Sequence, residues 1–198
     1  MADTNKVKFG IKSVYYAVAT IAADGTATYG DPVAMPGAVN LSLAPEGELS
    51  PFYADDIVFY QAAGNSGYTG TLELAKVPDS FKKDVLGYVE DSAGVLVEDA
   101  NAEVVPFALL FQMSGDAHAR RHVLYNCAAT RPELNAATIT ATKEPITDSI
   151  PLTCTTIHNS ALSIDTPKAS VAQGDTPYSG WFTAVYQSTG TQSTGTTP

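Results

Sequence analysis

The amino-acid sequence predicts a mainly β protein, a single-domain sandwich or barrel with one short helix. Short runs of β-branched and aromatic residues recur along the chain, and turn signals containing glycine, asparagine, aspartate or proline separate them. The 198 residues are 44% hydrophobic and 16% charged, which is typical of a folded chain with one sizeable core. Only one stretch carries helix signals at both of its ends.

The N-terminal part of the chain is expected to form short strands. Val7–Phe9 and Val14–Ala19 are extended runs, and the second ends before a turn of the Asp24-Gly25 kind. Val39–Leu43 alternates apolar and polar residues strictly, which indicates a half-buried strand.

The next stretch is predicted to be an extended polar loop followed by a hairpin. The loop covers about residues 45–55. Ile57–Ala62 and Tyr68–Ala75 are the two predicted strands of the hairpin, and residues 64–67, with the sequence GNSG, join them. Glycine and asparagine supply the positive φ angles that a tight turn needs.

The helix is predicted over about residues 78–86. A proline and acidic residues suit its start, and Gly87 suits its end. Phe81 and Val85 share one face at a spacing of four residues.

Two strand pairs are expected after the helix. Tyr88–Val89 and Val95–Glu98 bracket a turn and predict a second hairpin. Phe107–Met113 is a continuous apolar run of strand length, predicted to be buried on both faces. Arg121–Ala129 is expected to pair with it.

The remaining strands are predicted at Thr138–Thr142 and Ile146–Ile157, with Trp181–Tyr186 as a last strand. Pro145 and Pro151 predict edge or bulged positions, because proline cannot donate to a ladder. The resulting domain covers residues 1–186, including an N-terminal arm. Residues 187–198 (QSTGTQSTGTTP) are predicted to be a flexible low-complexity tail.

Charge and targeting signals limit the function. A net charge of −10 argues against a nucleic-acid-binding protein, which concentrates lysine and arginine to neutralise phosphates. Residues 1–6 lack the apolar core of a secretory signal, and no apolar run is long enough to cross a bilayer. We therefore expect synthesis in the cytoplasm, with Cys127 and Cys154 as buried free thiols.

No catalytic, metal or cofactor site is predicted. His118 and His122 have the spacing of a helical zinc pair, but arginine stands where a metalloprotease has its glutamate, and the region reads as a turn into a strand. The Asp55-Asp56 pair lacks the partners of a calcium loop or of an acid–base pair. We therefore expect a protein that is not an enzyme.

The predicted loop instead indicates a contact surface. Phe52 and Tyr53 are adjacent aromatic residues among acidic ones, and neighbouring residues of an extended stretch point to opposite faces. Such aromatic residues are suited to anchor a partner surface, although a local lid on the core is an alternative. An aromatic cluster around Trp181 predicts an apolar seam, against the body or a neighbouring subunit, with a sugar-stacking platform as the alternative. The predicted subunit-interface residues are Glu46, Glu48, Pro51, Phe52, Tyr53, Asp55, Asp56, Trp181 and Phe182.

Several motifs resemble the major tail protein family of phages with long non-contractile tails that infect Gram-positive bacteria. They are Pro36–Val39, Leu41–Pro45, Pro51–Asp55, Gly67–Gly70, Pro78–Phe81, Gly94–Glu98 and Arg121–Cys127, in order along the chain. The resemblance covers about residues 7–157. It implies a β domain of the phage tail-tube type.

The resemblance also implies a function and partners. Similar proteins form hexameric rings that stack into the tail tube, which conducts the genome into the host. The expected partners are other copies of the chain, a tape-measure protein inside the tube, terminator and initiator complexes at its ends, and double-stranded DNA in transient passage. The expected location is the virion tail, assembled in the host cytoplasm. A β-sandwich carbohydrate-binding module or adhesin is the alternative, and a hydrolase on a β scaffold a more remote one.

Overall fold

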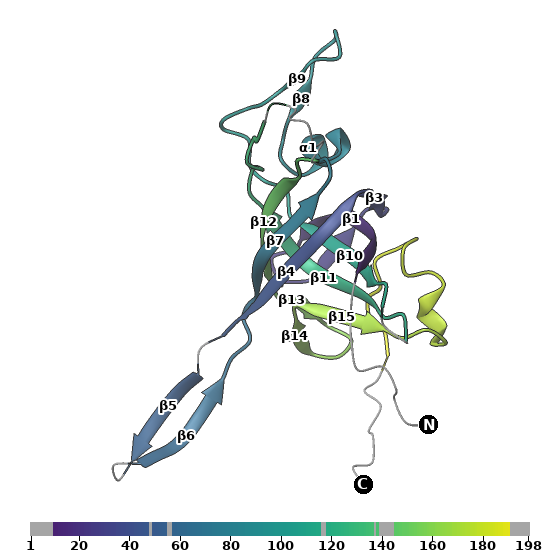
Figure 1. Cartoon of the computed structure of the whole chain (residues 1–198). Coiled ribbons are helices and arrows are strands. Elements are labelled where there is room, and N and C mark those ends of the chain that lie inside the picture. The colour runs from purple at the N-terminus through teal and green to yellow at the C-terminus, as the bar shows by residue number, and fades with distance from the viewer. Residues whose placement is uncertain are drawn as a thin grey trace.

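The computed structural model describes residues 10–47, 49–54, 57–115, 118–136, 138 and 145–190, with only the backbone described between residues 49 and 63. A nine-stranded sheet dominates it (Figure 1). In chain order, the elements are β1 (Ile11–Ile21), β2 (Ala27–Tyr29), β3 (Val33–Ala34), β4 (Ala38–Glu46), β5 (Leu49–Ala54), β6 (Ile57–Ala63), β7 (Gly67–Leu74), α1 (Asp79–Asp84), β8 (Val89–Glu90), β9 (Leu96–Val97), β10 (Phe107–Met113), β11 (Arg121–Ala129), β12 (Asp148–Thr155), β13 (Ile157–Asn159), β14 (Ile164–Thr166), β15 (Lys168–Val171) and the 3₁₀ turn η1 (Thr176–Tyr178).

The sheet has the strand order β2-β1-β10-β11-β12-β7-β4, with β3 paired to β1 and β15 paired to β11. Its central strand β10 is buried along Phe107–Gln112, which confirms the prediction of a strand covered on both faces. Successive side chains of a strand point to opposite faces, so β10 serves two apolar layers. Phe107 and Leu109 belong to one layer, whereas Ala108 and Leu110 belong to the other. The predicted pairing of β10 with β11 is also confirmed.

The first layer, which we call the inner core, lies on the face shared by all the long strands. It combines aromatic, aliphatic and sulfur-containing side chains from β1, β7, β10, β11, β12 and the helix region, among them Tyr16, Leu72, Phe81, Phe107 and Ile150. The second layer, the outer core, covers only the β1, β10 and β11 part of the opposite face, and its largest fully buried side chain is Trp181. The β12-β7-β4 part of that face carries no such layer among the described residues.

The predicted helix is present as α1, and it covers one end of the inner core. Phe81 and Val85 are fully buried, and the Phe81 ring makes edge contacts with Tyr16 and Phe107. Gly87 ends the helical region at φ +73°, and a Cβ atom there would lie 2.5 Å from the Cβ of Ala102. Glycine is therefore required at this stop.

The Tyr16 side chain ties β1 to this helix, and removal of its hydroxyl group in Tyr16→Phe is expected to destabilise the protein by about 1 kcal/mol. Its hydroxyl donates a 2.7 Å hydrogen bond to Asp84 Oδ2. Burial raises the pKa of Tyr16 from 10.0 to about 12, and the bond to Asp84 acts in the same direction. The folded state thus holds this proton more tightly than the unfolded chain, and the resulting stability is complete below pH 10 and lost as the pH rises towards 12.

The measurement is the melting temperature of the wild type and of Tyr16→Phe at pH 7 and between pH 10 and 12. The variant is expected to melt lower at pH 7 and to lose less stability over the alkaline interval. Equal alkaline losses in the two proteins contradict the assignment to Tyr16.

The predicted loop at residues 45–55 and the predicted hairpin of residues 57–75 are both wrong. Residues 49–54 form β5, which pairs with β6, while β7 pairs with β4. The four strands form one long antiparallel ribbon, interrupted midway near residues 47 and 64–66. The pairing of β4 with β7 places Leu41 opposite Leu72 on the inner core. Burial of these side chains therefore favours this pairing over the predicted pairing of residues 57–62 with residues 68–75.

Pro151 lies in β12, an interior strand whose pairing with β11 and β7 shows no register shift, so its prediction as an edge or bulged position is wrong. The Pro151 carbonyl accepts a hydrogen bond from Thr130 N, just past the end of β11. Because the N and the C=O of one strand residue point to the same side, the missing N–H faces the end of β11 and not the β7 ladder. Strand β12 can therefore contain proline at position 151, because the neighbouring strand β11 ends there and loses no ladder hydrogen bond.

The Trp181–Tyr186 run is not a strand. After η1 it continues in turns that pack on the outer face of the sheet. Gln187, placed in the tail by the sequence, donates from Nε2 to Ala27 O at 2.7 Å. The predicted Val7–Phe9 strand, most of the Thr138–Thr142 strand and residues 191–198 lie outside the described residues.

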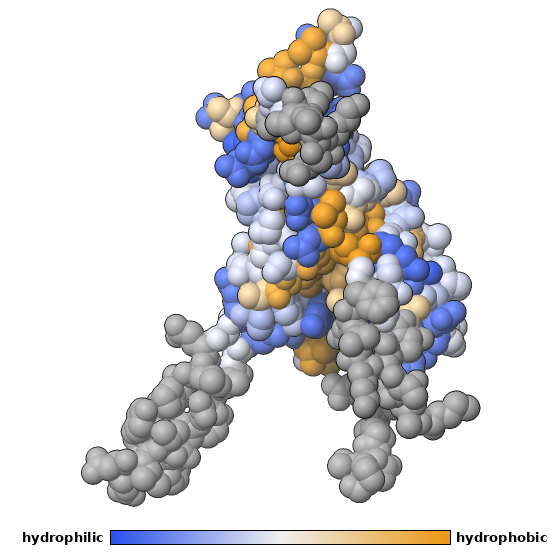
Figure 2. Space-filling model, viewed as in Figure 1, coloured by the Kyte–Doolittle hydropathy of each residue, from blue (hydrophilic) through white to orange (hydrophobic). Residues whose placement is uncertain are grey.

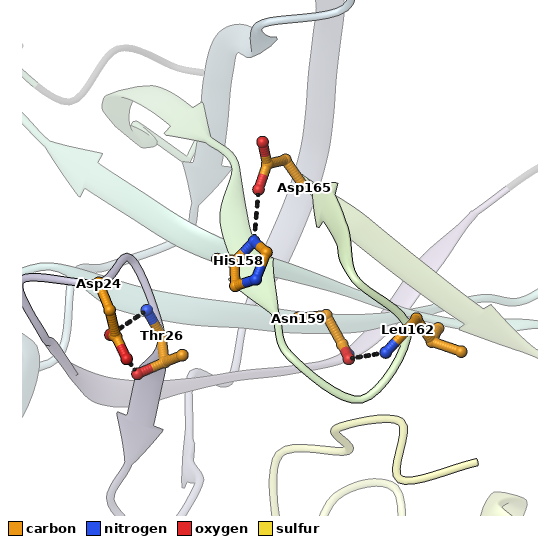
Figure 3. A network of polar contacts seen from close by, with 6 residues as sticks. All are labelled: Asp24, Thr26, His158, Asn159, Leu162 and Asp165. Carbon is orange, nitrogen blue, oxygen red and sulfur yellow. Dashed lines mark hydrogen bonds and ion pairs between the residues drawn. The ribbon is translucent and has the colours of Figure 1, made fainter. Parts of the chain in front are cut away.

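The predicted turn at Asp24-Gly25 is present and joins two parts of the fold (Figure 3). Asp24 Oδ1 accepts hydrogen bonds from the Thr26 hydroxyl at 2.7 Å and from the Thr26 N–H at 3.0 Å. These bonds lower the pKa of Asp24. The Gly25 carbonyl accepts from His158 N on β13, and His158 Nδ1 lies 2.9 Å from Asp165 on β14, so the β1–β2 turn is anchored to the β13–β14 hairpin.

Candidate assembly surfaces

The β5–β6 ribbon projects away from the sheet (Figure 1). Its two strands pair only with each other, from Leu49–Ala63 at the base to Ala54–Ile57 at the far end. A seven-residue strand such as β6 spans about 23 Å at roughly 3.3 Å per residue. An isolated two-stranded hairpin is only marginally stable in water, so this ribbon is suited to gain a partner.

Three of the nine predicted interface residues lie on the described part of this ribbon. Pro51, Phe52 and Tyr53 lie on β5, where Phe52 is registered opposite Tyr60. Glu46 is exposed at the end of β4. Glu48, Asp55 and Asp56 lie outside the described residues, and the interface role of the whole set stays a prediction.

The β12-β7-β4 part of the sheet presents a second surface, which we call the polar face. Its residues alternate with those of the inner core and are registered in rows across the three strands. The polar face consists of Asn40, Ser42, Ala44, Glu46, Thr69, Thr71, Glu73, Ser149, Pro151, Thr153 and Thr155. Small polar side chains predominate among these residues. Glu46 and Glu73 are their only charged members, and none of them is lysine or arginine. On β12 the last three residues of this set alternate as exposed positions with buried Ile150, Leu152 and Cys154.

A third surface is the β8–β9 hairpin, which the sequence predicted as a hairpin but not as a contact surface. Val89, Val95 and Val97 are 60%, 54% and 50% exposed. Figure 2 shows apolar residues at this end of the molecule, where the hairpin stands. Val89 and Val97 on the two short strands, with Val95 beside them, could have indicated an exposed apolar surface in the sequence.

The aromatic cluster near the C-terminal end of the described chain faces inward. Trp181 is 1% exposed, stacks on Tyr186 at 5.4 Å and donates from Nε1 to His122 O at 3.3 Å. Phe182 is half-buried and stacks on Tyr15 at 4.9 Å. The seam is therefore formed against the protein's own sheet, and a buried Trp181 offers no exposed ring face on which a sugar could stack. The interface role of Trp181 and Phe182 stays a prediction.

The Arg121 side chain packs on two aromatic rings of this cluster, Tyr178 and Phe182. Its guanidinium lies 3.8 Å from the centre of the Tyr178 ring and 4.7 Å from that of Phe182. The same group donates to the Tyr178 carbonyl and to Gln112 Oε1. The structure thus gives the carbohydrate-binding alternative no support.

The two cysteines face each other across β11 and β12 and are free and buried, as predicted. Burial raises the pKa of the Cys127 thiol. The described residues hold no cluster of three or more metal-ligating side chains. They also include no helix long and apolar enough to span a membrane.

A large β-sheet, a projecting two-stranded ribbon and a polar face without a second layer among the described residues place the chain in the mainly β class. Comparison with protein families narrows this class. The family described as phage tail tube protein matches residues 2–151, so the chain belongs to that family. No curated protein shows significant similarity to the chain.

The family membership confirms the resemblance to major tail proteins of phages with long non-contractile tails. The protein is a structural component of the virion tail and assembles with other tail proteins into the tail tube.

Proposed function

We propose that the chain polymerises as hexameric rings that stack into a tube, and that this tube conducts double-stranded DNA into the host. The β5–β6 ribbon of each copy reaches a neighbouring subunit or ring. The proposed partners inside and at the ends of the tube are a tape-measure protein, a terminator and an initiator complex. Synthesis and assembly take place in the host cytoplasm.

The projecting ribbon is the observation that carries this proposal. A β domain whose exposed strands contact a different patch on the next copy forms a ring if the rotation closes and a filament if it advances. A ribbon of about 23 Å is long enough to cross from one domain to the next. Main-chain hydrogen bonds to an open strand edge, repeated at every contact, supply the required affinity.

The polar face is the surface that we assign to the lumen. A protein binds duplex DNA mainly through lysine and arginine side chains, which replace the counterions condensed on the phosphates and release them into solution. The residues that make up the polar face include neither lysine nor arginine. Six copies with a net charge of −10 give −60 per ring, and the two glutamates of this face contribute to that charge. DNA therefore meets hydroxyl groups and like charge, which oppose long-lived contacts.

The proposed assembly is tested by negative-stain microscopy of concentrated protein, alone and with a tail initiator complex added. Rings with sixfold symmetry, or tubes built from them, support the proposal. Discrete single chains under both conditions contradict it, as do rings of a different symmetry.

Arginine on the polar face is expected to make the tube hold DNA. Ser42→Arg with Thr153→Arg adds two positive charges per subunit on β4 and β12, the two strands that flank β7. Variant tubes are expected to retain short duplex DNA at low salt and to release it at high salt, with bound DNA protected from nuclease because it lies inside. Wild-type tubes are expected to bind at least tenfold more weakly.

The matched control is Ser160→Arg with Ala161→Arg, two exposed positions on the β13–β14 turn away from the polar face. It has the same charge, so any DNA that it binds on the outside should be digested. Digestion of the DNA bound by the polar-face variant, in tubes of normal appearance, contradicts the assignment of this face to the lumen.

A further inference from the structure

The two halves of the sheet meet at one short ladder. Strands β1, β10 and β11 carry the outer core, whereas β12, β7 and β4 carry the polar face, and β11 pairs with β12 between them. Between the described residues, this pairing covers Asn126–Ala129 against Leu152–Thr155. On its other side β12 pairs with β7 along its whole length, from Asp148 to Thr155. The junction of the two halves is therefore held by fewer main-chain hydrogen bonds than the ladder beside it.

Both cysteines of the chain lie in this short ladder, directly opposite each other. Cys127 on β11 is registered against Cys154 on β12, and both side chains belong to the inner core. The two residues are 0% and 1% exposed, and both are free thiols. The two sulfur atoms therefore share one face of the sheet at one position of the register.

The pair occupies a non-hydrogen-bonded position of the antiparallel ladder. Thr130 N donates to the carbonyl of Pro151, its directly opposite residue, so these two form a hydrogen-bonded position. The two kinds of position alternate along a ladder, and Cys127 and Cys154 lie three residues away from that pair. Opposite Cα atoms at a non-hydrogen-bonded position are about 4.5 Å apart. Disulfides span Cα separations of about 4.4–6.8 Å, so the backbone already holds the two cysteines within disulfide range.

The fold protects the two thiols without separating them. Burial, and then the hydrogen bond between the two thiols, raise the pKa of Cys127. A raised pKa favours the protonated thiol, which is not the nucleophilic form, so reaction with an oxidant is slow. Cys154 is the last residue but one of β12, and strand ends open locally more often than strand centres. Slow oxidation through such openings is therefore the route that the geometry leaves.

We propose that Cys127 and Cys154 are an oxidation site, and that hydrogen peroxide converts them to a cross-strand disulfide once the virion has left the reducing host cytoplasm. The thiolate of one cysteine attacks a peroxide oxygen, the O–O bond breaks, and a sulfenic acid forms as hydroxide leaves. The thiolate of the other cysteine attacks that sulfur, so the S–S bond forms, the S–O bond breaks and a second hydroxide leaves. The two hydroxides take up the two thiol protons. Two thiols and one hydrogen peroxide thus give one disulfide and two water molecules, with two electrons passing from sulfur to oxygen.

The disulfide joins the two halves of the sheet covalently at their short junction. It also constrains the unfolded chain between residues 127 and 154, which stabilises the folded state. Outside the cell the glutathione and thioredoxin systems that reduce thiols are absent, so the bond persists there.

Treatment of the folded chain with hydrogen peroxide tests the site, at a concentration where sedimentation shows single chains. Catalase removes the peroxide before the protein is unfolded in urea with an alkylating reagent, so only thiols that stayed reduced are labelled. We expect an unlabelled single chain about 2 Da lighter than the untreated protein, with one pair of peptides linked through Cys127 and Cys154. Thiols that stay reduced, thiols oxidised to sulfinic acid, or a disulfide-linked dimer overturn the proposal.

The matched control is Cys127→Ala with Ala129→Cys. It has the same composition and keeps two buried thiols on one face, because Ala129 also lies in the inner core. Position 129 is registered against Leu152 and is therefore diagonal to Cys154, at about 7–8 Å. This separation is beyond disulfide range, so a disulfide is expected to form at least tenfold more slowly than in the wild type. Equal rates overturn the assignment to this pair of positions.

The melting temperature tests what the bond does. Oxidised wild type is expected to melt at least about 4 °C above the reduced protein, and dithiothreitol is expected to abolish the difference. Cys127→Ala treated with peroxide in the same way is expected to show no rise. An oxidised protein that melts at or below the temperature of the reduced one overturns the stabilising role. All of these experiments use single chains, so failure to form hexameric rings does not affect their outcome.

Discussion

Replacing Phe52 and Tyr53 by serine is expected to abolish tube formation and to leave a soluble, folded monomer. The two residues lie on β5, and the β5–β6 pair is separate from the nine-stranded sheet. Their replacement is therefore expected to remove the proposed aromatic contacts to a neighbouring copy and to leave the nine-stranded sheet intact. Negative-stain microscopy measures tubes, and circular dichroism together with the melting temperature measures the fold.

A control on the same ribbon separates the aromatic side chains from the ribbon itself. Ser50→Ala with Gln61→Ala changes two positions of β5 and β6 but keeps both aromatic residues, and it is expected to assemble normally. Normal tubes from the Phe52 and Tyr53 variant show that these side chains are not anchors. A melting temperature well below that of the wild type would instead indicate that they pack on their own domain.

Trp181→Ala is expected to cost about 3–5 kcal/mol of the free energy of unfolding, the range for large aromatic residues in a core. Trp181 is almost fully buried, and it holds the C-terminal turns on the sheet through its ring contact with Tyr186 and its bond to His122 O. Urea unfolding followed by circular dichroism gives the free energy. Proteolysis after residue 175 is expected to become faster, because the segment is no longer anchored.

The conservative control is Trp181→Phe. It keeps a ring in the outer core and loses the Nε1 bond and part of the volume, so a smaller loss of about 1–2 kcal/mol is expected. A loss below 1 kcal/mol for Trp181→Ala contradicts the view that residues 176–187 belong to the cooperative unit of the fold.

Local patterns predicted the strands that pack most completely. The apolar run Phe107–Met113 and its partner Arg121–Ala129 have the predicted bounds, because a strand buried on both faces has an unmistakable composition. The helix and the β8–β9 hairpin were predicted from proline, glycine and aspartate signals that act within a few residues. These elements depend on interactions between residues that are close together in the chain, so a single sequence is enough to predict them.

The candidate surfaces were only partly predictable. The sequence predicted Phe52 and Tyr53 to be anchors for a partner surface, which stays a prediction, and it placed them in a loop, because Pro51 and the acidic residues weaken a strand pattern. The polar face could not be recognised, since it exists only through the register of Ser42, Thr71 and Pro151 across three strands. Trp181 carried an aromatic signal that did not distinguish a seam on its own sheet from a contact with another copy.

By itself, the sequence determined that this chain is a mainly β structural protein of the tail-tube family, with one short helix and no legible active site. Alternation, turn residues and family motifs are properties of neighbouring positions, so they can be read without a fold. Only the tertiary structure decided which strands pair. Strands β5 and β6 form a projecting ribbon, and β4 pairs with β7, because the free energy of burying Leu41 and Leu72 in one core depends on contacts between distant segments.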